Sequence, residues 1–226
     1  MTFERILKYC KDLETNNNRT FFKESHPQYE QAKRDYLGFL DFLRFRIAEK
    51  APDIGKDIMY MEPKEWTYRI ARDMRYYHGN EPYNPTFRAY ISANKKSWMP
   101  IGYYLKIGNN CSCFGTGIWC EKTEQINKVR NYILENSDEF LNIIEKNKLT
   151  VTGDSLKNVP KHLPQESLVG EYLKMKNWMV IENIPNEDIT DFESFDGFLG
   201  DLMERMEPMR QFFLDAVNFV HSENID

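Results

Sequence analysis

Long apolar runs are missing from this sequence, and so is an excess of basic residues. No stretch approaches the roughly 20 apolar residues that a membrane-spanning helix needs, and segment 1–14 is charged and amphipathic, unlike a signal peptide. The formal net charge of −5 argues against a dedicated nucleic-acid binder, because such proteins carry a basic surplus. The sequence therefore predicts no membrane association and disfavours nucleic acid as a partner.

Cysteine is scarce, with 4 in 226 residues. Without a secretion signal, these residues are expected as free thiols in a reducing cytoplasm, so the predicted location is cytoplasmic. Cys111, Cys113 and Cys120 lack the spacing and the following histidines of a zinc site, which favours buried strand thiols. The histidines are scattered and form no H-E-x-x-H motif. No metal site is predicted, and the sequence does not indicate a cofactor.

Nucleotide-binding and nucleophile motifs are also missing. Gly-Thr-Gly at 115–117 lacks the other glycines of a dinucleotide fingerprint and the Gly-Lys-Ser/Thr ending of a P-loop. These glycines are expected to mark a bulge or a close backbone approach. No G-x-S-x-G nucleophile elbow is present, so the motifs do not decide whether the protein is an enzyme.

What the sequence does contain is helical periodicity at both ends. Apolar residues spaced by three and four predict helices at 3–14, from 25–27 to before Pro52, at about 126–134, at 136–144 and at about 194–220. Pro208 is expected to kink or split the last of them, because proline removes a helical hydrogen bond.

The middle of the chain predicts mainly strands. Hairpins are expected from 58–61 with 66–71 and from 102–108 with 111–119, a short helix at about 86–91, a short strand after 149 and another strand at 178–184. The strands do not alternate regularly with helices, so the predicted class is α+β. We expect one domain over 1–226, with a core at about 3–217 and a mainly antiparallel sheet against N-terminal, middle and C-terminal helices.

The most distinctive segment is RIARDMRYYHGNEPYNP, residues 69–85. If 68–76 continues as a strand, Arg69, Asp73 and Arg75 share one face, and Arg72 lies on the other. One interpretation is an anion-binding pocket, because the planar guanidinium pairs well with carboxylate or phosphate. Its walls would be Tyr76, Tyr77 and Tyr83. The other interpretation is a structural ion-pair network around Asp73.

Two further elements are candidates for the same pocket. Lys157 and Lys161 flank a Val-Pro pair and could add positive charge, although solvated surface lysines are the simpler interpretation. His78 lies within the arginine segment and is the histidine that we consider as an acid or base.

Several separated stretches carry a family resemblance. In order and spacing they resemble the bacterial and fungal family catalogued as domain of unknown function 2461, over about residues 3–217. They are NNNRTFF (16–22), RIARDMRYY (69–77), EPYN (81–84), YYLKI (103–107), GTGIW (115–119), VTGDSLKNVPK (151–161) and YLKMKNWMV (172–180).

The resemblance implies an α+β domain and brings no established activity, substrate or cofactor. It implies that Asn17 and Arg19, in the first turn, belong to the same set of motif positions as the arginine segment. The chain departs from that pattern at Asn80 and Asn84, where lysines are usual, and at Tyr77, which replaces a small polar residue. The loop is therefore less basic than the pattern implies.

Two functional hypotheses follow. In the first, a pocket binds a small anionic ligand and supports hydrolase-like chemistry. Its ligand-binding residues would be Arg19, Arg69, Arg72, Arg75, Tyr76 and Lys157, with Asp73 as general base and Tyr83 as proton donor. In the second, the protein is a non-catalytic interaction or regulatory module that uses exposed aromatic residues, the acidic stretch 182–204 and the C-terminal helix.

Overall fold

A five-stranded antiparallel sheet lies at the centre of the molecule, in the strand order β1-β2-β3-β5-β4. The structure is a computed structural model that describes residues 3–95, 101–189 and 192–218. The strands are β1 (Thr86–Ile91), β2 (Tyr103–Gly108), β3 (Ser112–Trp119), β4 (Val151–Thr152) and β5 (Asn177–Ile184). β1 and β4 are therefore the two edges of the sheet.

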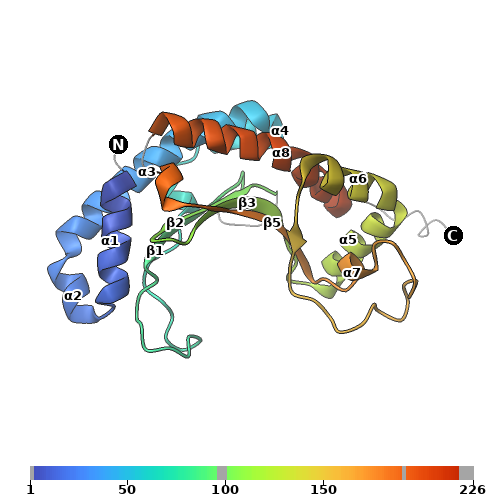
Figure 1. Ribbon diagram of the computed structural model, residues 1–226, viewed down its shortest axis with the longest axis horizontal. Coiled ribbons are helices and arrows are strands. Elements are labelled where there is room, and N and C mark those ends of the chain that lie inside the picture. The colour runs from blue at the N-terminus through green and yellow to red at the C-terminus, as the bar shows by residue number, and fades with distance from the viewer. Residues whose placement is uncertain (1–2, 96–100, 190–191, 219–226) are drawn as a thin grey trace.

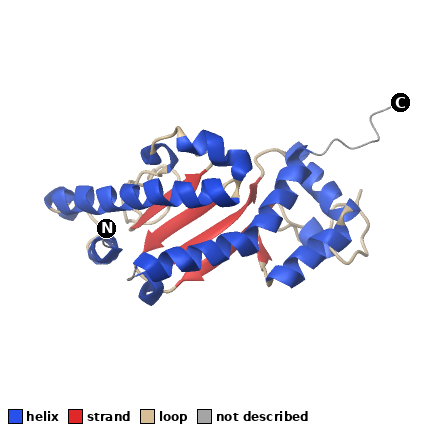
Figure 2. Ribbon diagram, turned by 90° about the horizontal axis from the view of Figure 1, so that it is seen from above, coloured by secondary structure: helices blue, strands red, loops and turns tan. Residues whose placement is uncertain are grey.

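Helices surround this sheet unevenly. They are α1 (Phe3–Thr15), α2 (Arg19–Glu24), α3 (His26–Lys50), α4 (Pro52–Met59), α5 (Thr123–Glu135), α6 (Ser137–Asn147), α7 (Gly170–Leu173) and α8 (Phe192–Asn218), with short 3-10 turns at Pro63–Trp66 and Asn186–Ile189. Figure 1 shows α3, α4 and α8 across one face of the sheet, and Figure 2 shows the long helices running over the strands. Among the described residues, no helix is long and apolar enough to cross a membrane.

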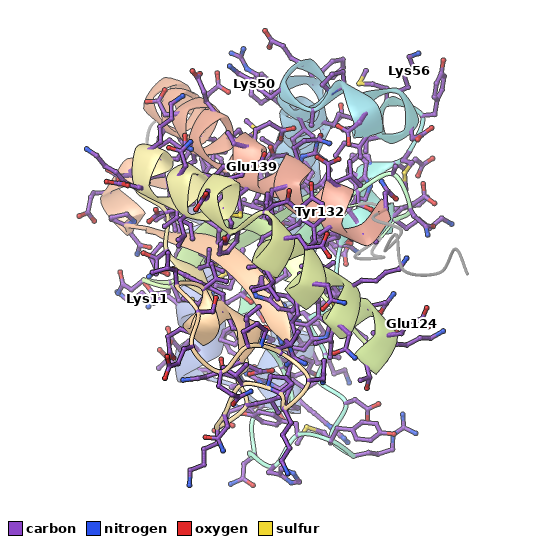
Figure 3. The ribbon with its side chains drawn as sticks, turned by 90° about the vertical axis from the view of Figure 1, so that its right-hand side faces the viewer. Lys11, Lys50, Lys56, Glu124, Tyr132 and Glu139 are labelled. Carbon is purple, nitrogen blue, oxygen red and sulfur yellow. The ribbon has the colours of Figure 1, made fainter. Side chains whose placement is uncertain are left out.

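The core lies between this helical layer and the sheet. Phe3 of α1 contacts Phe39 of α3 and Phe195 of α8 edge to face, with ring centroids 4.8 and 5.0 Å apart. Figure 3 shows α5 and α6 packed across α8, and the ring of Tyr132 lies 4.9 Å from that of Phe212. Each large apolar side chain buried in this way contributes about 1.5–3 kcal/mol.

The two faces of the sheet differ in exposure. Residues that face the helices are buried, including Phe87, Leu105, Phe114 and Val180. On the opposite face, Ile181 and Trp119 remain 38% and 44% exposed. We call this opposite side the open face. In Figure 1 the segments before β1 and after β4 extend on that side, at the two ends of the sheet.

A buried ion-pair network joins α8 to the rest of the fold. Arg210 of α8 has no exposed surface and donates to both carboxylate oxygens of Asp53, at 2.9 and 2.6 Å. It also bonds both oxygens of Glu207 and the carbonyl of Ile101. Tyr103 donates to Glu207 at 2.5 Å. Burial alone would lower the pKa of Arg210, but the bonds to Glu207 and Asp53 outweigh it and raise that pKa.

The α+β prediction and the β2–β3 hairpin are confirmed, with Asn110 at φ 52° in the connection. Two local predictions are wrong, the hairpin from 58–61 with 66–71 and the helix at 86–91. Segment 58–61 is not a strand, because Pro52 starts a helix that continues to Met59. Segment 66–71 begins at the end of a 3-10 turn and continues as irregular chain, and 86–91 is strand β1. Of the two outcomes expected at Pro208, a split does not occur, because α8 continues on both sides of it, and a kink stays a prediction.

Candidate functional site

The arginine segment forms a two-limbed loop beside the edge strand β1. Its first limb pairs with β1 through the bond from Tyr68 N–H to the carbonyl of Arg88, at 2.9 Å. The two limbs bond each other, from Arg72 N–H to Pro82 and from Asn84 N–H to Ile70. The condition on which the two faces were assigned, a strand that continues over 68–76, therefore does not hold.

The reason lies in the loop's own sequence. Tyr76 and Tyr77 donate their backbone N–H groups to the carbonyl of Asp73, which closes a turn. Pro82 and Pro85 lack the N–H groups that a continuing ladder would need. The arginines are consequently placed by a turn rather than by strand alternation.

The second limb is held by the first helices. The side-chain amide of Asn17 donates to the carbonyl of Tyr83 at 2.9 Å and accepts from its N–H at 3.0 Å. The ring of Tyr83 is stacked on Phe22 of α2, with centroids 4.2 Å apart. These contacts explain why Asn17 belongs with the loop, which the sequence alone could not show.

We expect Asn17→Ala to lower the free energy of unfolding by about 1–3 kcal/mol, because two partly buried hydrogen bonds to Tyr83 are lost together. Urea denaturation at neutral pH measures the change. Asn16→Ala is the matched control, because the Asn16 side chain bonds only the carbonyl of Asp12 within its own helix end. Equal losses in the two variants would contradict the anchoring role of Asn17.

Arg72 is held in the loop by one hydrogen bond and one ring contact. Its Nε donates to the carbonyl of Tyr83 at 2.9 Å, and its guanidinium carbon lies 4.0 Å from the centre of the Tyr77 ring. Tyr77 in turn donates to Glu81 at 2.9 Å. Within the described chain, the terminal nitrogens of Arg72 have no hydrogen bond or ion pair.

Asp73 is engaged by its neighbours. Arg75 bonds both of its carboxylate oxygens at 2.9 and 2.6 Å, and Arg69 lies 3.7 Å away. The hydrogen bond from Arg75 is the main cause that lowers the pKa of Asp73. Arg75 and Asp73 therefore form a structural ion pair, as the second interpretation of the segment expected. Arg72 is different, because its terminal N–H groups remain available to a ligand.

A cavity of about 360 Å³ opens beside Arg72. We call it the Arg72 cavity. Its lining includes Arg69, Arg72, Arg88, Tyr68, Tyr76 and Tyr77. A neighbouring cavity of about 270 Å³, the Lys33 cavity, shares Tyr68, Arg69 and Arg88 with it and adds Lys33 of α3. Three arginines and a lysine thus line two adjacent cavities at the edge of the sheet.

Arg88 is a site residue that the sequence analysis missed. Its guanidinium Nη2 donates to the carbonyl of Arg69 at 3.3 Å, and its Nε is buried without a hydrogen-bond partner among the described residues. It was missed because 86–91 was taken for a helix. The alternation in Thr-Phe-Arg-Ala-Tyr-Ile, which places Arg88 opposite Phe87 and Ala89, was the available signal.

Other predicted site residues lie elsewhere. Tyr83 turns its ring to Phe22 and does not line either cavity, and Arg19 is exposed at the start of α2. Lys157 is exposed in the segment after β4, at the edge of the sheet opposite β1 (Figure 1). The structure therefore does not bring Lys157 to the arginines. Lys161 shares that segment, and His78 is exposed near the loop turn.

The Gly-Asp pair at 153–154 has a packing explanation. A Cβ on Gly153 would lie 1.9 Å from the carbonyl oxygen of Asn177, so only glycine fits there. Asp154 bonds the Asn177 side chain through both its backbone N–H and its carboxylate, each at 3.1 Å. This motif fixes the loop to the start of β5.

The chemistry available at the Arg72 cavity is recognition of negative charge. Within the described residues, no group of three or more His, Cys, Asp or Glu side chains could hold a metal ion. The arginines and tyrosine hydroxyls provide donors that suit phosphate or carboxylate oxygens.

Comparisons with known proteins bear on the family. No curated protein and no solved structure matches the chain. One family model does match, over residues 5–212, and its description is a conserved hypothetical protein. The match covers most of the 226 residues, from α1 to α8. The chain therefore belongs to the conserved hypothetical protein family DUF2461.

Proposed function

We propose that the protein binds a small anionic ligand, bearing phosphate or carboxylate, in the Arg72 cavity. The observation that carries this proposal is how Arg72 is held. The hydrogen bond from its Nε to the carbonyl of Tyr83 and the contact with the Tyr77 ring fix the guanidinium. Its terminal N–H groups have no hydrogen-bond acceptor among the described residues and can donate to a ligand. A donor group fixed before binding loses less conformational entropy when a ligand arrives, which favours affinity.

The charge around the cavity supports the same proposal. Arg69, Arg72 and Arg88 line it, and the carboxylate in the lining, Asp73, is neutralised by Arg75, which does not line it. The local balance is therefore positive although the whole chain is acidic. An anion entering the cavity would meet charge-assisted hydrogen bonds, which are roughly twice as strong as neutral ones.

The proposal concerns binding rather than hydrolysis. A general base works best with a pKa near the working pH, and the bond from Arg75 lowers the pKa of Asp73 instead. Tyr83, the other candidate catalytic group, packs on Phe22 away from the cavity. Hydrolase-like activity would need a base or nucleophile other than Asp73 and Tyr83. Analysis of the ligand for hydrolysis products after the binding experiments tests for such activity directly.

The test is calorimetric titration of the full-length protein with phosphate and with citrate. We expect Arg72→Gln to weaken binding at least tenfold, because a hydrogen bond to a charged group contributes about 1.5–3 kcal/mol. Arg34→Gln is the control, since Arg34 is exposed on α3 and changes the net charge equally. An unchanged dissociation constant in Arg72→Gln would reject the proposed site.

Thermal unfolding provides an independent readout. A ligand at 100 times its dissociation constant adds about 2.7 kcal/mol to stability, which for a protein of this size raises Tm by about 5–10 °C. The shift should be present in Arg34→Gln and absent in Arg72→Gln.

One observation favours the second candidate, a non-catalytic interaction module. The loop turn exposes two apolar side chains, Met74 at 42% and Tyr76 at 78%. The acidic stretch gives it less support than its sequence suggests, because several of its acids pair internally: Asp196 with Arg46, Glu204 with Lys50 and Glu182 with Arg205. A partner that binds wild type and not Met74→Ser/Tyr76→Ser in affinity chromatography would support this candidate.

A further inference from the structure

Two cations lie directly opposite each other on the open face. Arg88 of β1 and Lys106 of β2 are register partners. Because side chains alternate along a strand, both lie on the face opposite to their buried neighbours Phe87, Ala89, Leu105 and Ile107. Like charges directly opposite each other on neighbouring strands are destabilising. Within the described residues, no acidic side chain pairs with either of them.

The neighbours of this pair offer no compensating charge. Lys106 is followed across the sheet by Cys113 of β3 and then by Asn183 of β5. Arg88 bonds a backbone carbonyl, and its buried Nε has no partner among the described residues. The guanidinium of Arg88 also lies 5.6 Å from the centre of the Tyr68 ring. The fold therefore keeps two adjacent positive charges without a carboxylate partner among the described residues.

Arg88 also connects this pair to the proposed binding site. It lines both the Arg72 cavity and the Lys33 cavity. Lys106 lines neither cavity, but neighbouring strands are about 4.8 Å apart, and Lys106 is the register partner of Arg88, which lines both. Arg72 of the loop, Arg88 of β1 and Lys106 of β2 therefore follow one another in a row across the edge of the sheet.

A single phosphate or carboxylate is too small to contact both ends of this row. We propose that the ligand carries two or more linked anionic groups, as in a diphosphate or a longer phosphate chain. One group binds at Arg72, and the next binds between Arg88 and Lys106. This inference rests on the proposed function and specifies the class of its ligand.

The test compares inorganic phosphate, pyrophosphate and tripolyphosphate by calorimetric titration. Wild type should bind pyrophosphate at least tenfold more tightly than phosphate. Lys106→Met should weaken pyrophosphate and tripolyphosphate about fivefold or more and change phosphate less than twofold. Lys11→Met on the exposed side of α1 (Figure 3) is the control and should leave all three constants unchanged.

The outcomes separate the inference from the function it deepens. Equal affinities for phosphate and pyrophosphate, or an equal loss for both in Lys106→Met, would overturn the inference while the single-anion site stands. Failure of all three probes to bind wild type would overturn both. A nucleoside diphosphate titrated alongside distinguishes an esterified from a free diphosphate, and tight binding of either supports the linked-anion ligand.

Stability without ligand gives a second check. Because Lys106 faces a like charge, ligand-free Lys106→Met should melt at the same temperature as wild type or higher. A clear decrease in Tm would show that Lys106 stabilises the fold, and would contradict a role reserved for the ligand.

Discussion

Arg210→Met is expected to lower the free energy of unfolding by about 3 kcal/mol, because it leaves two partly exposed acids without their buried partner. The Arg210 side chain is fully buried and holds Asp53 and Glu207 together. Those acids retain some contact with water, at 33% and 24% exposure, which places the expected loss at the lower end of the range for buried pairs.

Urea denaturation measures this loss, with Arg46→Met as the control. Arg46 forms an equally short pair with Asp196, at 2.6 Å, but its side chain is 46% exposed. Exposed pairs contribute about 1 kcal/mol or less. Similar losses in the two variants would show that burial of Arg210 does not increase the contribution of its ion pairs to stability.

A combined variant identifies the cause. If uncompensated charge is responsible, Asp53→Asn added to Arg210→Met should recover part of the lost stability. If packing around the lost guanidinium is responsible, Asp53→Asn should give no recovery. The double-mutant cycle thus separates charge from shape at one position.

This network also shows where sequence reasoning reaches its limit. The apolar spacing predicts a helix at about 194–220, and the structure has α8 there, with Met206 and Met209 buried on it. Nothing in that spacing indicates that Arg210 pairs with Asp53, which is 157 residues away. Long-range polar pairing depends on how elements pack, and the local pattern carries no information about it.

Only part of the candidate site was predictable, because its residues also come together through packing between distant segments. Strand alternation placed Arg72 on the face away from Asp73, and although 68–76 is not a strand, the carboxylate of Asp73 is indeed engaged by Arg75 and Arg69 instead. The sequence misplaced Lys157, because a basic residue in an ordered loop gives no sign of which sheet edge the loop follows. It missed Arg88 and Lys106 as a pair, because their register depends on β1 being a strand.

The glycine prediction was more successful. Gly115 and Gly117 were expected to mark a close backbone approach, and both face the backbone of β5. A Cβ on Gly117 would lie 2.3 Å from the carbonyl oxygen of Trp178, and Gly117 has φ +149°, which side chains rarely adopt. The β3–β5 pairing therefore depends on the absence of a side chain at this position.

Gly117→Ala is consequently expected to lower the free energy of unfolding by about 2–4 kcal/mol, because backbone strain and overpacking act together. The two nearest atoms are backbone atoms of β5 in the middle of the sheet, so they cannot move aside as a flexible side chain could. The loss should appear in urea denaturation and as a lower Tm.

Gly197→Ala is the matched control, and its expected effect has the opposite sign. Gly197 is exposed inside α8, and an added Cβ there meets no atom within 4 Å. Alanine in a helix is about 0.5–1 kcal/mol more favourable than glycine, so this variant should be more stable than wild type. A Gly117→Ala protein as stable as wild type would mean that β5 can move away from β3, and the close approach would not be a requirement of the fold.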